Sequence, residues 1–512
     1  MSRPAFVAVD LGATSGRVML AVVPDGARKV ELTETGRFGN RARTDASGAL
    51  RWDFDQLWAG ILEGLRAAAD EAAARGVTIR GIGVDSWAVD HGLLDAAGNL
   101  VDDPYCYRDP RTAGVPELVY SRVPFSEHYA VNGLQHLPFT TEFQVVAAAL
   151  AATGTPPDTA WLRAAHLLLL PDLVTYRLTG RRVAEVTNAS TTGLLDARTR
   201  TWAEEHIARL DTAFGLGGVR GRLADLVEPG TVVGPLLPEV ASLTGLAGLA
   251  EVHVIAVASH DTASAVVATP LSEPRPGEAA AYISSGTWSL VGLELAAPVL
   301  TEESRAAGFT NELGLDGTVR YLHNVMGLWV LDECVREWSA ADAAAGAEVV
   351  DLPALLAAAR REPGGRCLVG VDGDEFLAPG DMPRRLRAAI GRAGAAVPDT
   401  RPALVRVILD SLADAYARAV RRAGELAGVR VTAVHVVGGG SRNTLLNELT
   451  AQATGLPVVA GPVEAAALGN ALVQARAVGV LGGGLGVLRA VVRAGDELAV
   501  HEPGDVRLRE PG

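Results

Sequence analysis

The N-terminal segment reads Ala5-Phe6-Val7-Ala8-Val9-Asp10-Leu11-Gly12-Ala13-Thr14-Ser15-Gly16-Arg17-Val18-Met19-Leu20. An apolar run ends in the carboxylate of Asp10, crosses a turn rich in glycine and hydroxyl side chains, and continues as a second apolar run. This pattern predicts two strands of a meander, joined by a turn lined with backbone N–H groups. Such a turn can cradle a phosphate group, and Asp10 can hold Mg²⁺ directly or through a water molecule. Because a strand follows the turn instead of a helix, the segment is not a Walker A loop.

The same order of features returns in the second half of the chain. Residues 280–292 again read as a strand, a turn of Ser, Gly and Thr residues, and a strand, with Thr287 in the turn. The run Gly438-Gly439-Gly440 follows a further strand and precedes a helical pattern over 444–455. Glycines let a flat ring or a phosphate approach the backbone, and a helix N-terminus favours anions. Together these features resemble the duplicated ribonuclease-H-like ATPases, which include sugar kinases, actin and the heat-shock chaperone ATPases.

Length and composition indicate an intracellular protein with more than one core. A chain of 512 residues suggests two or three domains, because single cores rarely grow past about 250–300 residues. No apolar run reaches the roughly 20 residues of a membrane span, and Asp10 interrupts the first one, so we expect neither a signal peptide nor a membrane partner. The three cysteines are far apart and the net charge is −14. We therefore expect a cytoplasmic protein without disulfides and without a nucleic-acid partner.

The strongest chemical candidate is Asp261, which lies where an apolar strand over 252–257 gives way to a helical pattern beginning at Thr262. We expect its carboxylate to lie in a low-dielectric setting near a helix N-terminus. Phosphoryl transfer needs a group that orients the attacking hydroxyl and accepts its proton late. One carboxylate, a phosphate-cradling backbone and a metal ion suffice for that, and the neighbouring His260 can bond sugar hydroxyls. The alternative interpretation is that Asp261 simply caps the helix.

Beyond these features, the sequence resembles the FGGY carbohydrate kinases nearly from end to end. The motifs that carry the resemblance, besides the N-terminal turn, are Asp85-Ser86-Trp87-Ala88-Val89-Asp90, Tyr107-Arg108-Asp109-Pro110-Arg111-Thr112, Leu137-Pro138-Phe139-Thr140-Thr141, Thr187-Asn188-Ala189-Ser190-Thr191-Thr192, Ser259-His260-Asp261-Thr262-Ala263, Ser284-Ser285-Gly286-Thr287-Trp288, Asn324-Val325-Met326-Gly327-Leu328-Trp329 and Gly438-Gly439-Gly440. The resemblance implies an α/β fold of two ribonuclease-H-like (actin-like ATPase) domains that face each other across a nucleotide and substrate cleft. It implies an N-terminal FGGY domain with a sugar-binding insert over 1–250. A C-terminal FGGY domain over 251–512 would carry the catalytic aspartate and the adenosine-binding glycine turn.

The activity that the resemblance implies is ATP-dependent phosphorylation of the 1-hydroxyl of L-rhamnulose in rhamnose breakdown, with Asp261 as the proton acceptor. The residues that the resemblance assigns to the nucleotide are Ala13, Thr14, Ser15, Gly16, Arg17, Thr287, Asp332 and Gly439, with Mg²⁺ at Asp10. Those that it assigns to the sugar are Ala88, His260, Asp261, Thr262 and Asn324. Two positions depart from the family pattern. Ala88 stands where a glycine is expected, and Asp332 stands where a nucleotide-contacting glutamine is expected, although a carboxylate lacks amide donors and is poorly placed near phosphates.

Two other functions remain open at this point. The first is a sister kinase of the same family for L-fuculose, L-ribulose or a similar ketose. The second is an actin-like, nucleotide-switched assembly or chaperone protein, against which the irregular, aromatic-bearing region over 104–195 argues. A glycosidase is poorly supported, because glycine-rich phosphate turns would have no role in it. The expected partners are therefore ATP and a small ketose, bound by a monomer or a homodimer.

Overall fold

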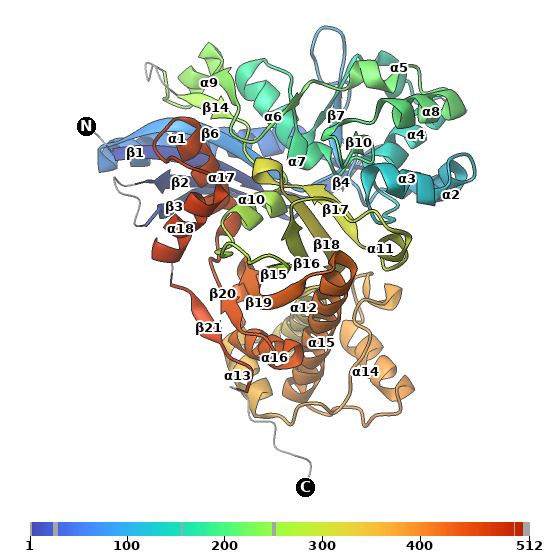
Figure 1. Cartoon of the computed structure of the whole chain (residues 1–512), viewed down its shortest axis with the longest axis vertical. Helices are drawn as coiled ribbons and strands as arrows, with labels where there is room; N and C mark the ends of the chain where they lie inside the picture. Colours follow the sequence, from blue (N-terminus) through green and yellow to red (C-terminus); the bar gives the residue numbers. More distant parts are fainter. Residues whose placement is uncertain (1–2, 24–28, 155–156, 248–251, 496, 505–512) are drawn as a thin grey trace. The chain divides into compact units, whose positions relative to one another are not determined.

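The structure, a computed structural model, describes residues 3–23, 29–154, 157–247, 252–495 and 497–504. The chain divides into two compact units, coloured along the sequence in Figure 1. The first unit consists of Met1–Pro270, Leu295–Tyr321 and Ala465–Asp496, and the second of Leu271–Glu294, Leu322–Glu464 and Glu497–Gly512. Each unit is therefore built from segments that are far apart in the sequence.

The first unit is built on a six-stranded mixed sheet in the order β13-β14-β6-β1-β2-β3. Its strands are β1 (Arg3–Leu11), β2 (Ser15–Val22), β3 (Glu31–Gly39), β6 (Val77–Ser86), β13 (Val232–Pro235) and β14 (His253–Ile255). The first three strands form the predicted antiparallel meander, and β6 runs parallel to β1. This register places Asp10 opposite Asp85, so two carboxylates lie on neighbouring strands at the carboxyl edge of the sheet.

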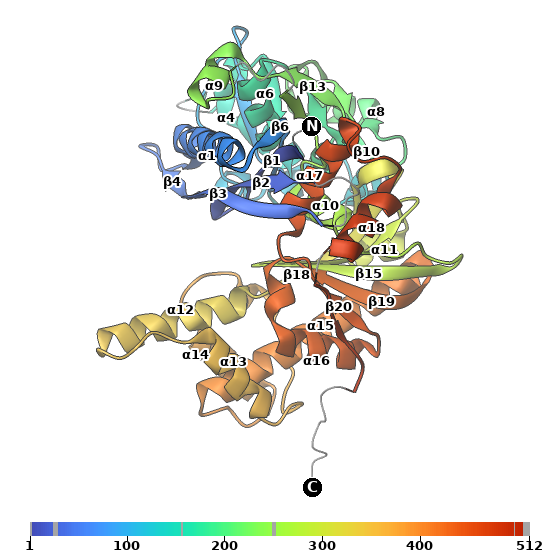
Figure 2. The ribbon, with the colours of Figure 1, turned by 90° about the vertical axis from the view of Figure 1, so that its left-hand side faces the viewer.

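Helix α1 (Phe54–Arg75) begins and ends where its sequence predicts. The carboxylate of Asp53 accepts a hydrogen bond from the backbone N–H of Gln56 at 3.0 Å and so caps the first turn. Gly76 ends the helix in the left-handed conformation, with a φ of 62°. The apolar stripe of α1 packs against the sheet, and Figure 2 shows the helix beside β2 and β3.

Alternation along β1 explains why both faces of the sheet are covered. Val7 and Val9 share a core with α1, whereas Ala8 packs against Ala467 of α17 (Ala465–Ala477) on the other face. Helix α10 (Asp261–Val267) packs tightly on α17, because a Cβ added at Gly469 would lie 1.8 Å from the carbonyl oxygen of Ser264. The first residue of α10 is thereby held at the sheet that carries Asp10 and Asp85.

Short helices and strands between β6 and β13 form an insert of the first unit. Those used below are α3 (Phe125–Asn132), α4 (Thr141–Ala152), α7 (Val186–Ala189) and α8 (Glu204–Phe214). Strand β17 (Thr310–Leu313) also belongs to the first unit, and β18 (Val319–Val325) begins in it.

The second unit repeats the plan of the first. Its strands follow the order β18-β16-β15-β19-β20-β21, with β15 (Glu278–Ser285), β16 (Ser289–Leu295), β19 (Arg430–Val437), β20 (Val458–Ala460) and β21 (Ala499–His501). β15 and β16 form the predicted hairpin, and β19 runs parallel to β15. The prediction of two ribonuclease-H-like domains is thus confirmed, because each unit has a sheet in which an antiparallel hairpin is followed by a strand parallel to its first strand. The helices used below are α12 (Trp329–Ala344), α15 (Arg401–Ala427) and α16 (Thr444–Thr454).

The compact units divide the chain differently from the predicted domains over 1–250 and 251–512. The boundary itself, at residues 250 and 251, lies outside the described residues. The structure groups Asp261 with the first unit, whereas the sequence analysis assigns it to the C-terminal domain. The reason is packing, because β14 pairs with β6 and α10 packs on α17, so both elements that flank Asp261 share the first core.

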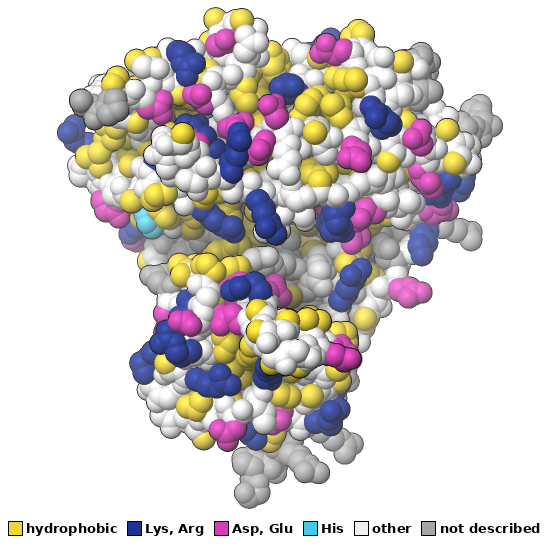
Figure 3. Space-filling model, turned by 180° about the vertical axis from the view of Figure 1, so that it is seen from behind, with side chains coloured by type: hydrophobic (Ala, Val, Ile, Leu, Met, Phe, Trp, Pro, Cys, Tyr) yellow, Lys and Arg dark blue, Asp and Glu magenta, His cyan; other side chains and the backbone are white. Residues whose placement is uncertain are grey.

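Basic and acidic side chains are interspersed on the face that Figure 3 shows, so the net charge of −14 forms no single acidic patch there. Within the part of the chain that the structure describes, no helix has both the length and the apolar character needed to cross a membrane.

Candidate functional site

Three carboxylates come together at the carboxyl edge of the first sheet. Asp85, near the end of β6, is buried, and its Oδ2 accepts a hydrogen bond from the side chain of Asn470 at 2.6 Å. Its other oxygen, Oδ1, is buried without a hydrogen-bond partner. Burial first, and then the charges of Asp10 and Asp261, raise the pKa of Asp85 well above its usual value. The edge therefore concentrates negative charge around an unsatisfied acceptor.

These side chains fit a hard divalent cation. A buried acceptor without a partner costs about 1–3 kcal/mol, and carboxylate oxygens are the ligands that Mg²⁺ prefers. Asp10, the predicted ligand, is also engaged with Arg17, whose Nη2 donates to its Oδ2 at 2.6 Å. Asp85 is thus a further candidate ligand that the sequence analysis did not assign. Its sequence signal is a carboxylate that ends a strand parallel to β1.

The predicted phosphate turn, Ala13 to Arg17, links β1 and β2. Within it, the N–H of Gly12 donates to the carbonyl oxygen of Ser15 at 2.9 Å. Asn40 braces the turn from outside, because its side chain donates to the carbonyl of Gly12 at 2.9 Å and its N–H donates to that of Thr14 at 3.0 Å. Sequence reasoning missed Asn40, which comes directly after the strand that pairs with β2. Thr14 itself is exposed.

Asp261 is the first residue of α10, and His260 stands at the N-cap position. The Oδ1 of Asp261 accepts from the N–H of Thr262 at 2.5 Å and from its hydroxyl at 3.1 Å, and lies 3.5 Å from Nε2 of His260. His260 thus occupies the N-cap position that the alternative interpretation gives to Asp261, while the carboxylate of Asp261 still accepts from an N–H of the first turn. The expectation of a buried, low-dielectric carboxylate is wrong, because 31% of this side chain is exposed. The strand ends at Ile255, and the following residues carry Asp261 out to the edge of the sheet.

Glu185, which the sequence analysis did not single out, fixes the segment before Asp261. Its buried Oε2 accepts from the N–H of Ser259 at 2.9 Å, from the hydroxyl of Ser259 at 2.7 Å and from the hydroxyl of Thr187 at 2.6 Å. The hydroxyl of Thr187 in turn accepts from the N–H of His260 at 3.3 Å. Burial raises the pKa of Glu185, and these donors offset part of that rise. The backbone on both sides of Ser259 is thus held by a satisfied buried carboxylate.

The loop that carries Ala88 contains a strained residue. Val89 has a φ of 66°, which is a genuine outlier for a β-branched side chain. Thr141 of α4 holds it in place by donating to its carbonyl oxygen at 2.7 Å. Asp90 is buried, which raises its pKa to about 6. Its carboxylate accepts from Trp52 Nε1 at 2.6 Å, Trp87 Nε1 at 2.9 Å, the backbone N–H of Tyr107 at 3.1 Å and Gln144 Nε2 at 3.1 Å. Strain that is so firmly supported is typical of a ligand site.

Backbone hydrogen bonds join these segments into one site within the first unit. The N–H of Ser86 donates to the carbonyl of Ser259 at 2.9 Å, and the N–H of Trp87 donates to that of Leu11 at 3.2 Å. The ends of β1 and β6 and the segment before α10 therefore lie side by side. The predicted residues that the first unit brings to this edge are Asp10, Ala13, Thr14, Ser15, Gly16, Arg17, Ala88, His260, Asp261 and Thr262.

The second unit holds the remaining predicted nucleotide residues at the carboxyl edge of its own sheet. The N–H of Trp329 donates to the carbonyl of Thr287 at 3.2 Å, so α12, which carries Asp332 in its first turn, starts beside the β15–β16 turn. The glycine turn packs on the end of β15, because a Cβ at Gly440 would lie 2.0 Å from Oγ of Ser285. Thr287, Asp332 and Gly439 therefore share one edge of this sheet.

Two side chains of this unit have unusual environments. The surroundings of the first turn of α12 partly desolvate Asp332 and, with a further contribution from Glu333, raise its pKa to about 6, although the residue is exposed on the surface of the unit. Asn324, the predicted sugar residue on β18, has a buried side-chain oxygen with no hydrogen-bond partner. Such an acceptor is available to a ligand hydroxyl, which would remove the cost of leaving it unpaired.

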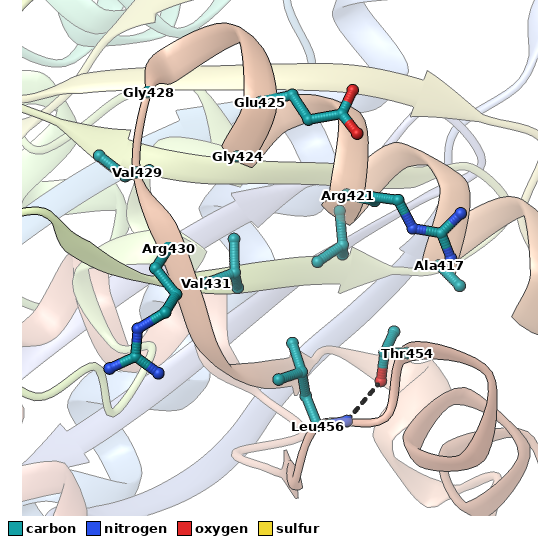
Figure 4. Close-up of a pocket in the computed structure, with 11 residues that line it drawn as sticks. Ala417, Arg421, Gly424, Glu425, Gly428, Val429, Arg430, Val431, Thr454 and Leu456 are labelled. Carbon is teal, nitrogen blue, oxygen red and sulfur yellow. Dashed lines mark hydrogen bonds between the residues drawn. The ribbon is translucent and has the colours of Figure 1, made fainter.

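A hollow of about 510 Å³ in the second unit is not part of this site (Figure 4). It lies between the end of α15 and the start of β19, and its lining includes Arg421, Glu425, Arg430 and Leu456. The glycine turn follows the opposite end of β19. Eight residues of strand separate the two by about 25 Å, since a strand rises about 3.3 Å per residue.

Among the described residues, His128, Glu142 and His206 are the one group of three His, Cys, Asp or Glu side chains whose possible metal-ligand atoms all lie within 4.8 Å of one another. His128 Nδ1 lies 3.1 Å and His206 Nε2 lies 3.2 Å from the same oxygen of Glu142. A metal-bound histidine donates its second N–H to an acceptor, whereas Nε2 of His128 is buried without a partner. We therefore interpret the group as a hydrogen-bonded brace that joins α3, α4 and α8.

Replacing Glu142 by Gln is expected to destabilise the fold by about 2–5 kcal/mol, because the shared acceptor of the two buried histidines loses its negative charge. Burial acts to raise the pKa of Glu142, but the neighbouring His128 and His206 outweigh this effect and hold the pKa below its usual value. The carboxylate thus stabilises the fold above its usual pKa, and this contribution is lost as the pH falls through the lowered pKa.

Thermal melting at a series of pH values tests this expectation. The gap in melting temperature between wild type and Glu142→Gln should shrink as the solution becomes acidic. Glu127→Gln is the matched control, since Glu127 on α3 forms an exposed pair with Arg209 and should matter little. A gap that stays constant down to the lowest pH would show that the charge of Glu142 contributes nothing.

Comparisons with known proteins match the chain to one family over most of its length. The profile of the FGGY family of carbohydrate kinases, N-terminal domain, matches residues 5–268, and that of the C-terminal domain matches residues 281–478. A rhamnulokinase of Bacteroides thetaiotaomicron is 41% identical to the chain over 474 residues, which cover 93% of this chain and 91% of the relative.

Solved structures of the same fold include sugar and glycerol kinases. A gluconate kinase and a ligand-bound xylulose kinase from Lactobacillus acidophilus each align with a TM-score of 0.75, at 15% and 16% identity, over 98% of this chain and 94% of theirs. Plasmodium falciparum glycerol kinase with ADP aligns with a TM-score of 0.74 at 13% identity, with the same coverage. At these identities the likeness establishes the two-domain fold.

Proposed function

We propose that this chain, which belongs to the FGGY family of carbohydrate kinases, transfers the γ-phosphoryl group of ATP to the 1-hydroxyl of L-rhamnulose. The 41% identity to a rhamnulokinase over 93% of the chain supports this substrate. The structural observation that carries the chemistry is the partly exposed carboxylate of Asp261, held on a fixed backbone beside Asp10 and Asp85. A cytoplasmic location follows from the proposal, because ATP is the phosphoryl donor.

In the proposed reaction, Asp261 orients the 1-hydroxyl of the ketose and accepts its proton as the phosphoryl group is transferred. Its carboxylate is anchored by the hydrogen bonds from Thr262, so little reorganisation is needed. Partial exposure gives the hydroxyl access to Asp261, and His260 and Thr262 are placed next to it to bond the other sugar oxygens. When bound, Mg²⁺ at Asp10 and Asp85 neutralises the charge of the phosphates.

Backbone geometry supports the roles that we propose for the remaining residues. The turn from Ala13 to Arg17 offers N–H groups to phosphate oxygens and is held in shape by Asn40. Ala88 precedes the strained Val89, so the backbone of this loop is fixed, and the methyl group of Ala88 adds bulk where the family pattern has glycine. In the second unit, Thr287, Asp332 and Gly439 would contact the nucleotide, and Asn324 would accept a hydrogen bond from a sugar hydroxyl.

A panel of ketoses assayed for ATP-dependent phosphorylation tests the proposal. We expect kcat/KM for L-rhamnulose to exceed that for L-fuculose and L-ribulose, with phosphate recovered on the 1-hydroxyl. A higher kcat/KM for another ketose would assign the chain to a sister kinase of the family. ATP consumption that no ketose accelerates would contradict the kinase proposal itself. Gel filtration of the same sample should give a monomer or a homodimer.

The KM for ATP should rise as the pH increases through about 6. Asp332 has a raised pKa, so it is neutral below this value and repels the nucleotide phosphates above it. In the wild type, we expect the KM for ATP to rise by about threefold to tenfold, because a shift of one pKa unit corresponds to about a tenfold change in an equilibrium constant. Any rise in the KM of Asp332→Gln over the same pH range should be smaller. ATP titrates identically with both proteins, so the difference between them isolates Asp332. Parallel pH profiles for wild type and Asp332→Gln would remove Asp332 from the nucleotide site.

A further inference from the structure

Behind His260 lies a buried ion pair that the proposed reaction does not use. The imidazole directs Nε2 towards Asp261 and Nδ1 towards the interior of the first unit. Arg320, on β18, is completely buried, and both Nη1 and Nη2 lie 3.2 Å from Nδ1 of His260. Glu312, on β17, balances this charge, because its Oε2 lies 2.8 Å from Nη1 of Arg320.

The chemistry of the guanidinium group determines which nitrogen of His260 carries the proton. Arginine has only donors and stays protonated, so a ring nitrogen that faces both of its Nη groups must accept a hydrogen bond. Nδ1 therefore carries no proton, and a neutral imidazole keeps its single proton on Nε2. Oε2 of Glu312 lies 3.1 Å from Nδ1 as a competing acceptor, but it is already engaged by Nη1 of Arg320 at 2.8 Å, whereas the two Nη groups of Arg320 have Nδ1 as their shared acceptor.

We propose that Arg320 is a positioning residue that fixes His260 as the Nε2–H tautomer, so that His260 donates a hydrogen bond into the sugar site beside Asp261. A donor at Nε2 suits an oxygen of the ketose or the carboxylate of Asp261, and it cannot take the hydroxyl proton that Asp261 is there to accept. The inference rests on the proposed function for its catalytic meaning, while the tautomer itself is a property of the resting protein.

The charges around His260 explain why an arginine is needed. Asp261 faces the ring from α10, Glu312 faces it from β17 and Arg320 faces it from β18. Without Arg320, Nδ1 would face only the carboxylate of Glu312, which accepts hydrogen bonds and would therefore favour a proton on Nδ1. Arg320 is further anchored by its own Nε, which donates to the carbonyl of Leu313 at 3.2 Å. The donor pair is therefore held rigidly against Nδ1.

The direct test is ¹⁵N NMR of the protein labelled at histidine, without sugar or nucleotide. The signal of His260 is identified by its loss in His260→Asn. We expect wild type to show Nε2–H with an unprotonated Nδ1. The double substitution Arg320→Met with Glu312→Gln removes both buried charges together, and we expect it to abolish this tautomer preference. A wild-type signal from Nδ1–H, or an unchanged tautomer in the double variant, would overturn the proposal.

Kinetics separates positioning from mere stability. In the double variant, the KM for the ketose should rise about tenfold, the loss typical of one hydrogen bond, while the KM for ATP stays within about twofold. Arg406→Met with Asp410→Asn is the matched control, as it removes an equally buried pair in the second unit. If both double variants change the KM for the ketose and the KM for ATP to the same extent, Arg320 has only a structural role.

The ketose assay and the NMR measurement test the proposed function and the proposed role of Arg320 separately. Failure of every ketose in the wild-type assay would contradict the proposed function and leave the NMR result standing. A wrong tautomer in a protein that phosphorylates L-rhamnulose would contradict only the role of Arg320.

Discussion

Replacing Asp261 by Asn is expected to lower turnover by roughly 10²–10⁴-fold, the usual loss when a positioned proton acceptor is removed. Asparagine keeps the shape of the side chain, and its carbonyl oxygen can still accept from the N–H of Thr262, as Oδ1 of Asp261 does at 2.5 Å. What it loses is the ability to take the hydroxyl proton. The KM for ATP should therefore change little, and steady-state kinetics with both substrates varied measures the two effects separately.

A matched control is Asp102→Asn, which removes an exposed carboxylate of the first unit that pairs with Arg163. It should leave turnover unchanged. If Asp261→Asn retains more than about a tenth of wild-type turnover, the assignment of Asp261 is wrong. Asp85 then becomes the next candidate, ahead of Asp90, because Asp85 has an unpartnered oxygen whereas Asp90 accepts four hydrogen bonds.

The parts of the fold that the sequence predicts are those set by local rules. The meander follows from two apolar runs around a polar turn, and α1 follows from its cap at Asp53, its apolar stripe and its end at Gly76. The residues that hold the site in place cannot be predicted from such local rules. Glu185 and Ser259 meet across 74 residues of sequence, and Arg320 meets His260 across 60. The sequence around a buried carboxylate or guanidinium does not indicate which distant residue it will contact in the folded protein.

The grouping of α17 with the first unit is a further case. Its sequence lies near the C-terminus, yet it packs on β1 and β6. Two features of the sequence are explained by this packing: Asn470 is a buried polar residue on a mostly apolar helix, and Gly83 interrupts a strand that contains β-branched residues. A Cβ at Gly83 would lie 2.5 Å from the side-chain oxygen of Asn470, so the glycine makes room for the residue that bonds Asp85. The role of Asn470 and that of Gly83 can be understood only when both positions are known in the folded structure.

Replacing Gly439 by Val is expected to raise the KM for ATP by at least about tenfold while the KM for the ketose changes little. A Cβ at Gly439 meets no atom of the protein within 4 Å, and its φ lies outside the left-handed region, so the fold should accept the side chain. The added bulk matters only to a ligand that approaches the backbone, and a clash with the nucleotide is felt in binding, where every 1.4 kcal/mol is about tenfold.

The neighbouring glycines supply the contrast that makes this result interpretable. Gly440 is closed to any side chain, with Oγ of Ser285 only 2.0 Å from its Cβ position, and Gly438 has a φ of 81°. Substitutions at either should lower the melting temperature, whereas Gly439→Val should melt like wild type. An unchanged KM for ATP in a stable Gly439→Val protein would mean that the nucleotide does not lie against this turn. Equal rises in both KM values would point instead to a displaced backbone, which affects the two substrates alike.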